Sequence, residues 1–334
     1  MKRLSIFIVG IMVAVVAMSR TFDMKQLGAD AKGINSCTEL INRTIEKAAL
    51  EGGGTIYFPA GTYLTATIHM KSNITLYLES GAVLRFSDKF EDYLPFVTLR
   101  WEGTVMKSLS PLIYAHSADN VTISGRGTLD GNGLKWWLWE FDTRKVIKEN
   151  GGKLPALDKL QQMWVDANKD LEISDYYKPS LERRMFRPPF IQFYECTNIL
   201  IENVKIINSP FWTINPAFCD NVTIHGVTIN NPSSDPKGPN TDGINPSSCR
   251  NVRISDCLIS VGDDCITIKS GRDADGRKYG KACENITITN CIMLSGHGGV
   301  VIGSEMSGGV KRVAISNCVF DGTNAGIRLK ASRG

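Results

Sequence analysis

The chain repeats a short pattern in which an asparagine precedes alternating apolar and polar residues. Copies begin at Asn198, Asn221, Asn251 and Asn285, and in a fifth copy Arg312 replaces the asparagine, at successive spacings of 23, 30, 34 and 27 residues. An apolar–polar alternation of period two is typical of a strand with one buried face. A constant strand pattern with connections of variable length indicates the coils of a solenoid. We therefore predict an all-β fold, a single-stranded right-handed parallel β-helix.

The cysteines follow the same repeat. Of the nine cysteines, four lie two residues before a repeat asparagine and three lie six residues after a repeat start, namely Cys196, Cys219, Cys249 and Cys283, and then Cys257, Cys291 and Cys318. Equivalent positions of a parallel β-helix stack about 4.8 Å apart, so we expect two internal ladders of buried free thiols. Disulfides between stacked neighbours are the alternative at this spacing.

Four Asn-x-Thr triplets match the acceptor pattern for N-glycosylation, beginning at Asn73, Asn120, Asn221 and Asn285. All four fall on the strand repeat or on its weaker early copy. We therefore expect these asparagines to have a structural role in the ladder.

The first nineteen residues differ from the rest of the chain. Lys2 and Arg3 precede an uncharged apolar run, 4–18, and a small-residue cleavage site follows. This pattern predicts a signal peptide over 1–19, and hence a secreted protein, extracellular or periplasmic, without a membrane span after cleavage. The rival interpretation, an uncleaved anchor, would need an apolar run of roughly 20 residues.

Residues 20–334 are predicted to form one catalytic β-helix domain with a helix capping its N-terminal end. Ser36 and Glu39 have capping-box spacing, and three glycines, 52–54, would end the helix. An insertion of mainly helical character, about 133–184, lacks the strand repeat and carries four tryptophans. These tryptophans would either stack on sugars or pack the insertion onto the solenoid. Only four residues follow Lys330, so we expect C-terminal coils to be missing.

The repeat also places polar residues beside one another. Pairs of apolar residues two apart, such as Ile266 and Ile268, mark strands of a further sheet, and the residues between them face outward. Counting back from these pairs stacks Asp242 on Asp264 and Asp263 on His297. Arg328 and Lys330 alternate with inward residues on a later coil, so they face outward on the same side. Such a cluster suits acid/base chemistry beside cations that hold an anionic sugar.

Overall charge contributes little to the functional prediction. The chain has 38 Lys+Arg and 34 Asp+Glu, a net charge of +4, and no basic run of five or more residues. Nucleic acid is therefore not expected as a partner. We expect a monomer that needs no cofactor and no metal ion.

The chain contains four motifs in this order: Asn240-Thr-Asp-Gly, Gly262-Asp-Asp, Gly296-His-Gly and Arg328-Leu-Lys. Together they resemble the polygalacturonase family of pectin-cleaving glycoside hydrolases. The resemblance implies a pectin lyase-like β-helix that hydrolyses α-1,4-galacturonosyl bonds of an acidic plant cell-wall polysaccharide with inversion.

The resemblance also implies a role for each matching residue. Asp263 would be the general acid, Asp242 and Asp264 would activate water, and His297 would orient Asp263. Asn240, Gly298, Arg328 and Lys330 would contact substrate, the last two through a sugar carboxylate. Crowding of the carboxylates should raise the pKa of one of them, as an acid catalyst requires.

Two features depart from the family or from general rules. Leu329 stands where the family has isoleucine, at an inward position, and no substrate-contacting tyrosine can be assigned. Carboxylates on adjacent rungs suggest the close spacing associated with retention, whereas the family implies inversion. Two other functions remain open: a pectin lyase-type elimination enzyme and a non-catalytic polysaccharide-binding β-helix.

Overall fold

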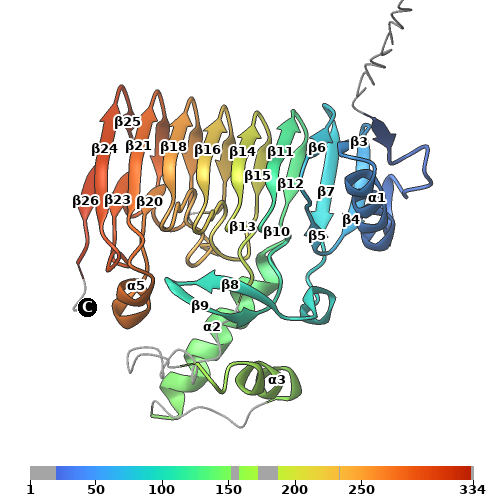
Figure 1. Ribbon diagram of the computed structural model, residues 1–334. Helices are drawn as coiled ribbons and strands as arrows, with labels where there is room; N and C mark the ends of the chain where they lie inside the picture. The colour runs from blue at the N-terminus through green and yellow to red at the C-terminus, as the bar shows by residue number, and fades with distance from the viewer. Residues whose placement is uncertain (1–19, 152–157, 172–186, 233, 332–334) are drawn as a thin grey trace, which may run out of the picture.

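The computed structural model describes residues 20–151, 158–171, 187–232 and 234–331, and its main body is a solenoid of three parallel sheets (Figure 1). The first sheet contains, in order, β1 (Thr21–Asp23), β3 (Gly54–Phe58), β6 (Ile74–Leu78), β11 (Asp119–Gly125), β14 (Thr197–Glu202), β16 (Asp220–His225), β18 (Arg250–Ser255), β21 (Cys283–Thr289) and β24 (Val310–Ser316). The second contains β2 (Lys32–Ser36), β4 (Gly61–Thr65), β7 (Ala82–Phe86), β12 (Thr128–Asp130), β15 (Lys205–Ile207), β17 (Thr228–Asn230), β19 (Leu258–Ser260), β22 (Ile292–Ser295) and β25 (Val319–Phe320). The predicted stacking of parallel coils is confirmed.

The third sheet forms in two segments. One contains β5 (Ile68–His69), β10 (Ile113–His116) and β13 (Ile191–Tyr194), and the other contains β20 (Ile266–Ile268), β23 (Val300–Ile302) and β26 (Ile327–Leu329). Single bridges join the segments, from Ile191 to Ile214, on to Ile244 and then to Ile266. The predicted site residues lie on this sheet or in the turns before it, except Lys330, which directly follows β26.

The repeat asparagines form a ladder along the outside of the first sheet. Asn120 donates its amide to Asn73 Oδ1 at 2.8 Å, and Asn221 donates to Asn198 Oδ1 at 2.6 Å. Each has a positive φ, between 54° and 61°, which asparagine tolerates better than most residues. The asparagine thus turns the chain into each strand and bonds to the coil before it, as the repeat predicted.

The cysteine ladders are present as free thiols. All nine cysteines are free, and all but Cys318 are buried. Burial raises the pKa of the Cys219 and Cys283 thiols, which therefore stay neutral at physiological pH. The prediction of buried free thiols is confirmed, and the disulfide alternative is not.

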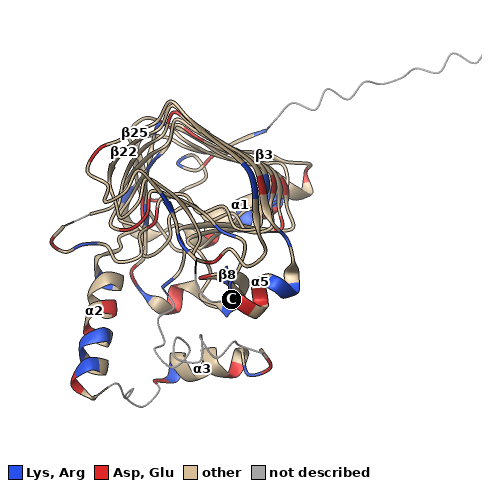
Figure 2. Ribbon diagram, turned by 90° about the vertical axis from the view of Figure 1, so that its left-hand side faces the viewer, with Lys and Arg blue, Asp and Glu red and all other residues tan. Residues whose placement is uncertain are grey.

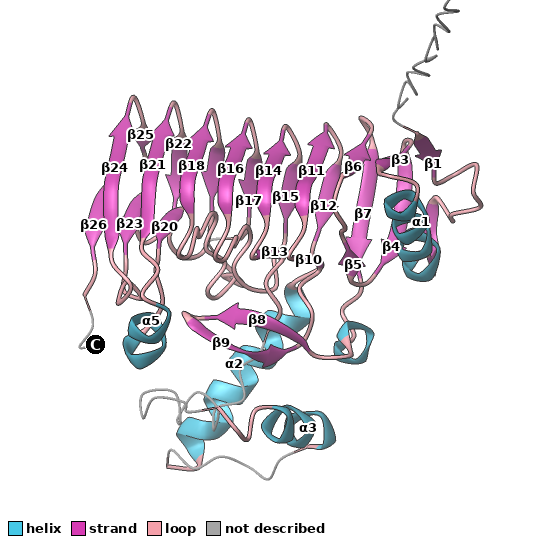
Figure 3. Cartoon of the chain, viewed as in Figure 1, coloured by secondary structure: helices cyan, strands magenta, loops and turns pink. Residues whose placement is uncertain are grey.

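Helix α1 (Thr38–Leu50) packs at the N-terminal end of the solenoid, where it buries Ile41, Ile45 and Ala48 (Figure 3). The capping-box prediction is wrong. A capping box needs Ser36 at the N-cap, but the N-cap is Cys37, and no side chain caps the helix. The predicted stop is confirmed: the Gly53 N–H donates to the carbonyl of Ala48 at 2.8 Å. The helix covers apolar side chains of the first coils.

Elements outside the coils gather on the third-sheet side of the solenoid (Figures 1 and 3). They are the antiparallel hairpin of β8 (Val97–Trp101) and β9 (Thr104–Ser108), the short helices η1 (Phe90–Tyr93) and α5 (Asp273–Tyr279), and the helices α2 (Leu134–Glu149) and α3 (Lys159–Ala167). None of the helices in the described ranges is long and apolar enough to cross a membrane.

Helices α2 and α3 lie in the predicted insertion, whose segments 152–157 and 172–184 are outside the described residues. Its tryptophans serve mainly for packing. Trp136, Trp137 and Trp164 are buried, and Trp137 Nε1 donates to the carbonyl of Ser209 at 2.9 Å. This bond fixes α2 to a coil of the solenoid. Among the four tryptophans only Trp139 is partly exposed.

Candidate active site

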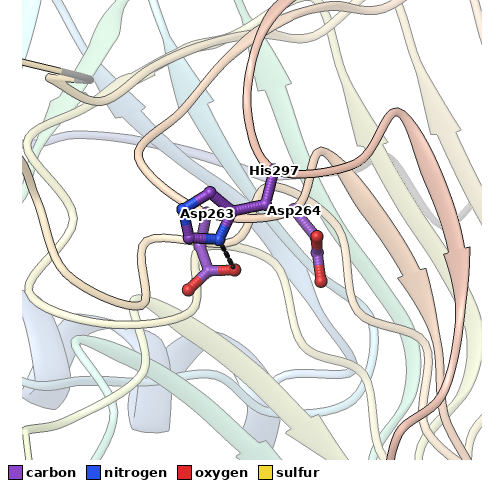
Figure 4. A group of neighbouring side chains, drawn as sticks. All are labelled: Asp263, Asp264 and His297. Atoms are coloured by element: carbon purple, nitrogen blue, oxygen red, sulfur yellow. Dashed lines mark hydrogen bonds and ion pairs between the residues drawn. The ribbon is translucent and has the colours of Figure 1, made fainter. Parts of the chain in front are cut away.

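The predicted stacking of Asp242, Asp263, Asp264 and His297 is present. The Gly243 N–H donates to the carbonyl of Asp264 at 3.0 Å, and the His297 N–H donates to the carbonyl of Asp263 at 2.8 Å. These bonds align the turn before each strand of the third sheet with the turn on the next coil. The side-chain ligand atoms of Asp263, Asp264 and His297 consequently lie within 4.8 Å of one another (Figure 4).

Asp242 is a buried carboxyl in a polar cage. It is almost fully buried, and its Oδ2 accepts hydrogen bonds from Asn245 Nδ2 at 3.2 Å and Thr267 Oγ1 at 3.3 Å. Burial, and then the charge of Asp263, raise the pKa of this carboxyl well above its ordinary value. The expected elevation therefore falls on Asp242, which the resemblance assigns to water activation rather than to acid catalysis.

Asp264 is also buried but has a cationic partner. Lys330 Nζ donates to its Oδ2 at 2.5 Å, whereas its Oδ1 is buried without a hydrogen-bond partner among the described residues. A buried oxygen of this kind needs a donor, and a water molecule can supply one. A Cβ on Gly298 would lie 3.2 Å from that same oxygen, so glycine there keeps the space open. The carboxylate is thus arranged to hold a water molecule.

Asp263 is the more accessible carboxylate, with 19% of its side chain exposed. Its Oδ1 lies 3.1 Å from His297 Nδ1. On the other side of the ring, Lys237 Nζ lies 2.7 Å from Nε2. An ammonium group only donates, so Nε2 accepts, and the ring proton is on Nδ1, facing Asp263. The row Lys237, His297 and Asp263 therefore fixes the tautomer of the histidine.

The two predicted substrate-binding cations differ in their surroundings. Arg328 lies beside Val301 in the strand register and is exposed, with no ion-pair partner among the described residues. Lys330 is only 25% exposed and is paired with Asp264. Arg328 is thus available to bind a carboxylate, and in this structure Lys330 balances the charge of the buried Asp264.

Asn240 lies at the rim of the cluster and has a left-handed backbone, with φ 54°. Its Oδ1 accepts from Arg187 Nη2 at 2.7 Å and faces Arg144 Nη2 at 3.5 Å. A pocket of about 190 Å³ opens in front of it. Its lining residues come from α2, from the 237–240 loop and from the catalytic turns: Phe141, Arg144, Lys237, Pro239, Asn240, Gly262, Asp263 and His297.

A buried ion network lies on the other side of Asp242. Lys269 Nζ is 2.6 Å from Glu305 Oε2, and Arg272 Nη2 is 2.5 Å from Glu305 Oε1. Although burial acts to raise it, the pKa of Glu305 is brought down to about 2 by Lys269 and Arg272. The positive charge of Lys269 also acts to lower the pKa of Asp242, against the larger effect of burial.

Sequence reasoning missed Lys237, Arg144, Arg187 and this buried network. Lys237 and Arg144 lie outside the strand repeat, in a loop and in the insertion, so no register count reaches them. Lys269 does fall on the strand pattern, at the next outward position after Thr267, and that position could have identified it.

The cluster of Asp263, Asp264 and His297 is compact enough to ligate a metal ion. Two of its ligand atoms already contact ammonium groups, since His297 Nε2 faces Lys237 and Asp264 Oδ2 faces Lys330. These cations supply the positive charge that a metal would bring, and we assign no metal site here.

Fold and site together define a pectate lyase-like parallel β-helix with a carboxylate cluster beside its third sheet. Residues 178–334 match the family model described as glycosyl hydrolases family 28, and residues 21–139 match the model described as rhamnogalacturonase A/epimerase, pectate lyase-like. The chain belongs to glycoside hydrolase family 28.

Two named relatives support the same family. A probable polygalacturonase of Vitis vinifera is 33% identical over 296 residues, which cover 87% of this chain and 52% of that protein. An endo-polygalacturonase of Pectobacterium carotovorum subsp. carotovorum is 28% identical, over 91% of this chain and 69% of that one. This chain thus spans about half the length of the Vitis relative.

Among solved structures, a hyperthermoactive exopolygalacturonase from Thermotoga maritima is similar to this chain. It superposes with a TM-score of 0.79 at 39% identity, over 93% of this chain and 68% of that one. A polygalacturonase from Erwinia carotovora superposes with a TM-score of 0.68 at 25% identity, over 93% of this chain and 71% of the other.

Proposed function

We propose that the chain hydrolyses α-1,4-galacturonosyl bonds in pectin as a polygalacturonase. The observation that carries this proposal is the pairing of an accessible carboxylate, Asp263, with His297 and Lys237, directly beside the buried pair Asp242 and Asp264. The exposed Arg328 nearby suits an anionic sugar polymer. The polygalacturonases among its relatives support the same substrate class.

In the proposed mechanism Asp263 is the general acid. It is the catalytic carboxyl that a glycosidic oxygen can reach, and His297 holds it in place through the 3.1 Å contact. Protonation of the leaving oxygen by a positioned acid typically accelerates such reactions by about 10²–10⁴-fold.

Asp264 and Asp242 act together on the attacking water. Asp264, paired with Lys330, is the base, and its unpartnered Oδ1 accepts the water. Both carboxyls are more than nine-tenths buried, so a sugar carbon cannot reach their oxygens, whereas a water molecule can. Direct attack by water gives inversion, although the short separation of the carboxylates is the spacing usually associated with retention.

Two measurements distinguish this function from its alternatives. Incubation with polygalacturonate should release new reducing ends without unsaturated, UV-absorbing products. Elimination would give the UV-absorbing products, and a binding-only β-helix would bind the polymer without releasing ends. The absence of new reducing ends from a chain that binds the polymer would overturn the proposal.

The proposal also includes export of the protein from the cytoplasm. The basic start, the apolar run and the small-residue site within 1–19 support a cleaved signal peptide and a location outside the cytoplasmic membrane, where plant cell-wall polymers are met. N-terminal sequencing of the protein recovered from the medium or the periplasm tests this, and retention of residues 1–19 on the exported protein would contradict it.

A further inference from the structure

Helix α2 of the insertion contributes part of the wall of the catalytic pocket. Arg144 and Phe141, both from α2, line the same pocket of about 190 Å³ as Asp263 and His297. Figure 2 shows α2 as a separate helix beside the solenoid, with both acidic and basic residues, the basic ones mainly toward its lower end in that view. The pocket therefore has one side made of solenoid turns and one side made of the insertion.

Arg144 is fixed on the side of the pocket by a buried acid. Its Nε donates to Glu140 Oε1 at 2.5 Å, and the Glu140 side chain is fully buried one helical turn away. Glu140 Oε2 also lies 3.9 Å from Nε of the buried Arg187. Burial lowers the pKa of Arg187 only to about 10, so it remains positive at neutral pH. Glu140 thus lies between two cations and holds one of them at the pocket.

The outer edge of the Arg144 guanidinium remains available. Half of the side chain is exposed, and its only other polar contact with a residue that the structure describes is the long 3.5 Å approach of Nη2 to Asn240 Oδ1. Guanidinium groups bind carboxylates through paired N–H donors. A galacturonosyl residue in the pocket would place its carboxylate within reach of this edge, with Phe141 as the apolar wall beside the ring.

We propose that Arg144 forms a second carboxylate-binding subsite, supplied by the insertion, for the sugar that occupies the Asp263 pocket. Arg328 does not line this pocket, so the two arginines bind carboxylates of different sugar residues in one galacturonan chain. This subsite rests on the proposed function, because its ligand is the acidic sugar of that substrate.

Binding of trigalacturonate to an Asp263→Asn background, measured by calorimetry, tests the subsite. Arg144→Gln removes the charge but keeps a donor for Glu140, and Arg144→Lys keeps the charge. Lys145→Ala is the matched control, since Lys145 is the next residue, is exposed and does not line the pocket. Loss of one charged hydrogen-bond pair predicts about 10- to 100-fold weaker binding for Arg144→Gln. Arg144→Lys should stay within about fivefold and Lys145→Ala within about twofold of the parent.

The same variants in the active chain should show the loss mainly in KM for polygalacturonate. Binding of Arg144→Gln within twofold of the parent, while the unmodified chain hydrolyses polygalacturonate, would overturn the subsite alone. An equal loss in Lys145→Ala would overturn it too, because bulk charge would then explain the effect. If the unmodified chain releases no reducing ends and the parent does not bind trigalacturonate, the proposed function itself fails.

Discussion

Lys237 Nζ lies 2.7 Å from His297 Nε2, on the opposite side of the ring from Asp263. An ammonium at this distance fixes the ring proton on Nδ1, so the histidine presents one N–H to Asp263. Without Lys237 the ring could adopt the other tautomer, which would place a lone pair against the carboxylate of Asp263. Lys237 is thus a positioning residue that acts through His297 on Asp263, the proposed general acid.

Lys237→Met should therefore lower kcat by roughly 10-fold or more, with a smaller change in KM, because the acid is misplaced while most sugar contacts remain. Lys237→Arg should recover much of the loss, since it restores a donor to Nε2. Lys148→Met on α2 removes the same charge at an exposed site and should leave both constants unchanged. Steady-state kinetics on polygalacturonate check this, and a loss confined to KM would contradict the positioning role.

Asp263→Asn should remove turnover and retain binding. The asparagine has the same shape, and its carbonyl can still accept from His297 Nδ1, but it has no proton of suitable acidity for the leaving oxygen. We expect kcat to fall by about 10²–10⁴-fold. Reducing-end assays and calorimetry with trigalacturonate measure the two effects separately. Turnover close to that of the unmodified chain would rule out Asp263 as the acid.

Asp242 should make the protein less stable as pH rises. Its folded-state pKa is raised above the unfolded value, so between these two values the folded chain binds more protons than the unfolded chain. The free energy of unfolding then decreases with pH across that window, by about 1.4 kcal/mol for each pKa unit of elevation. Below the unfolded value, near pH 4, this penalty is absent.

Asp242→Asn removes this titration and keeps an oxygen for Asn245 and Thr267. The variant should melt at a higher temperature than the unmodified chain above about pH 4, with a difference that grows as pH rises towards the folded-state pKa. Thermal melts at a series of pH values measure it. A melting-temperature difference that does not depend on pH would show that Asp242 does not carry the elevated pKa. The variant should also lose activity, since in the proposed mechanism Asp242 assists the attacking water.

The solenoid and the stacking of the candidate site residues could be predicted because both follow one repeat. The pattern of Asn221 and Ile224 recurs in the late coils, with Arg312 in place of the asparagine in the last one. On the third sheet, counting back three residues from the inward Ile266 and Val300 places Asp263 beside His297. The same count reaches Arg328, which pairs with Val301. In a stacked fold, the residues that pair between neighbouring coils can therefore be identified from the repeat in the sequence.

Contacts made by segments outside the repeat could not be predicted in this way. Lys237 reaches His297 from a loop, and Arg144 reaches Asn240 from a helix 96 residues earlier in the chain. No periodicity relates these residues to the coils. The capping box failed for a different reason: Ser36 has the right spacing to Glu39, but it is used as the last residue of β2.

We predict the stereochemistry of the proposed reaction from the burial of Asp264 rather than from its distance to Asp263. A nucleophilic carboxylate has to bond to the sugar carbon, and an oxygen of a side chain that is only 2% exposed cannot reach it. Water held on Asp264 Oδ1 can, and its attack opposite the leaving oxygen inverts the anomeric centre. NMR of the first product formed from polygalacturonate should show the β-anomer before mutarotation. Initial formation of the α-anomer would contradict this prediction. It would mean that Asp264 bonds to the sugar directly, and that the site with substrate bound is much more open than in this structure.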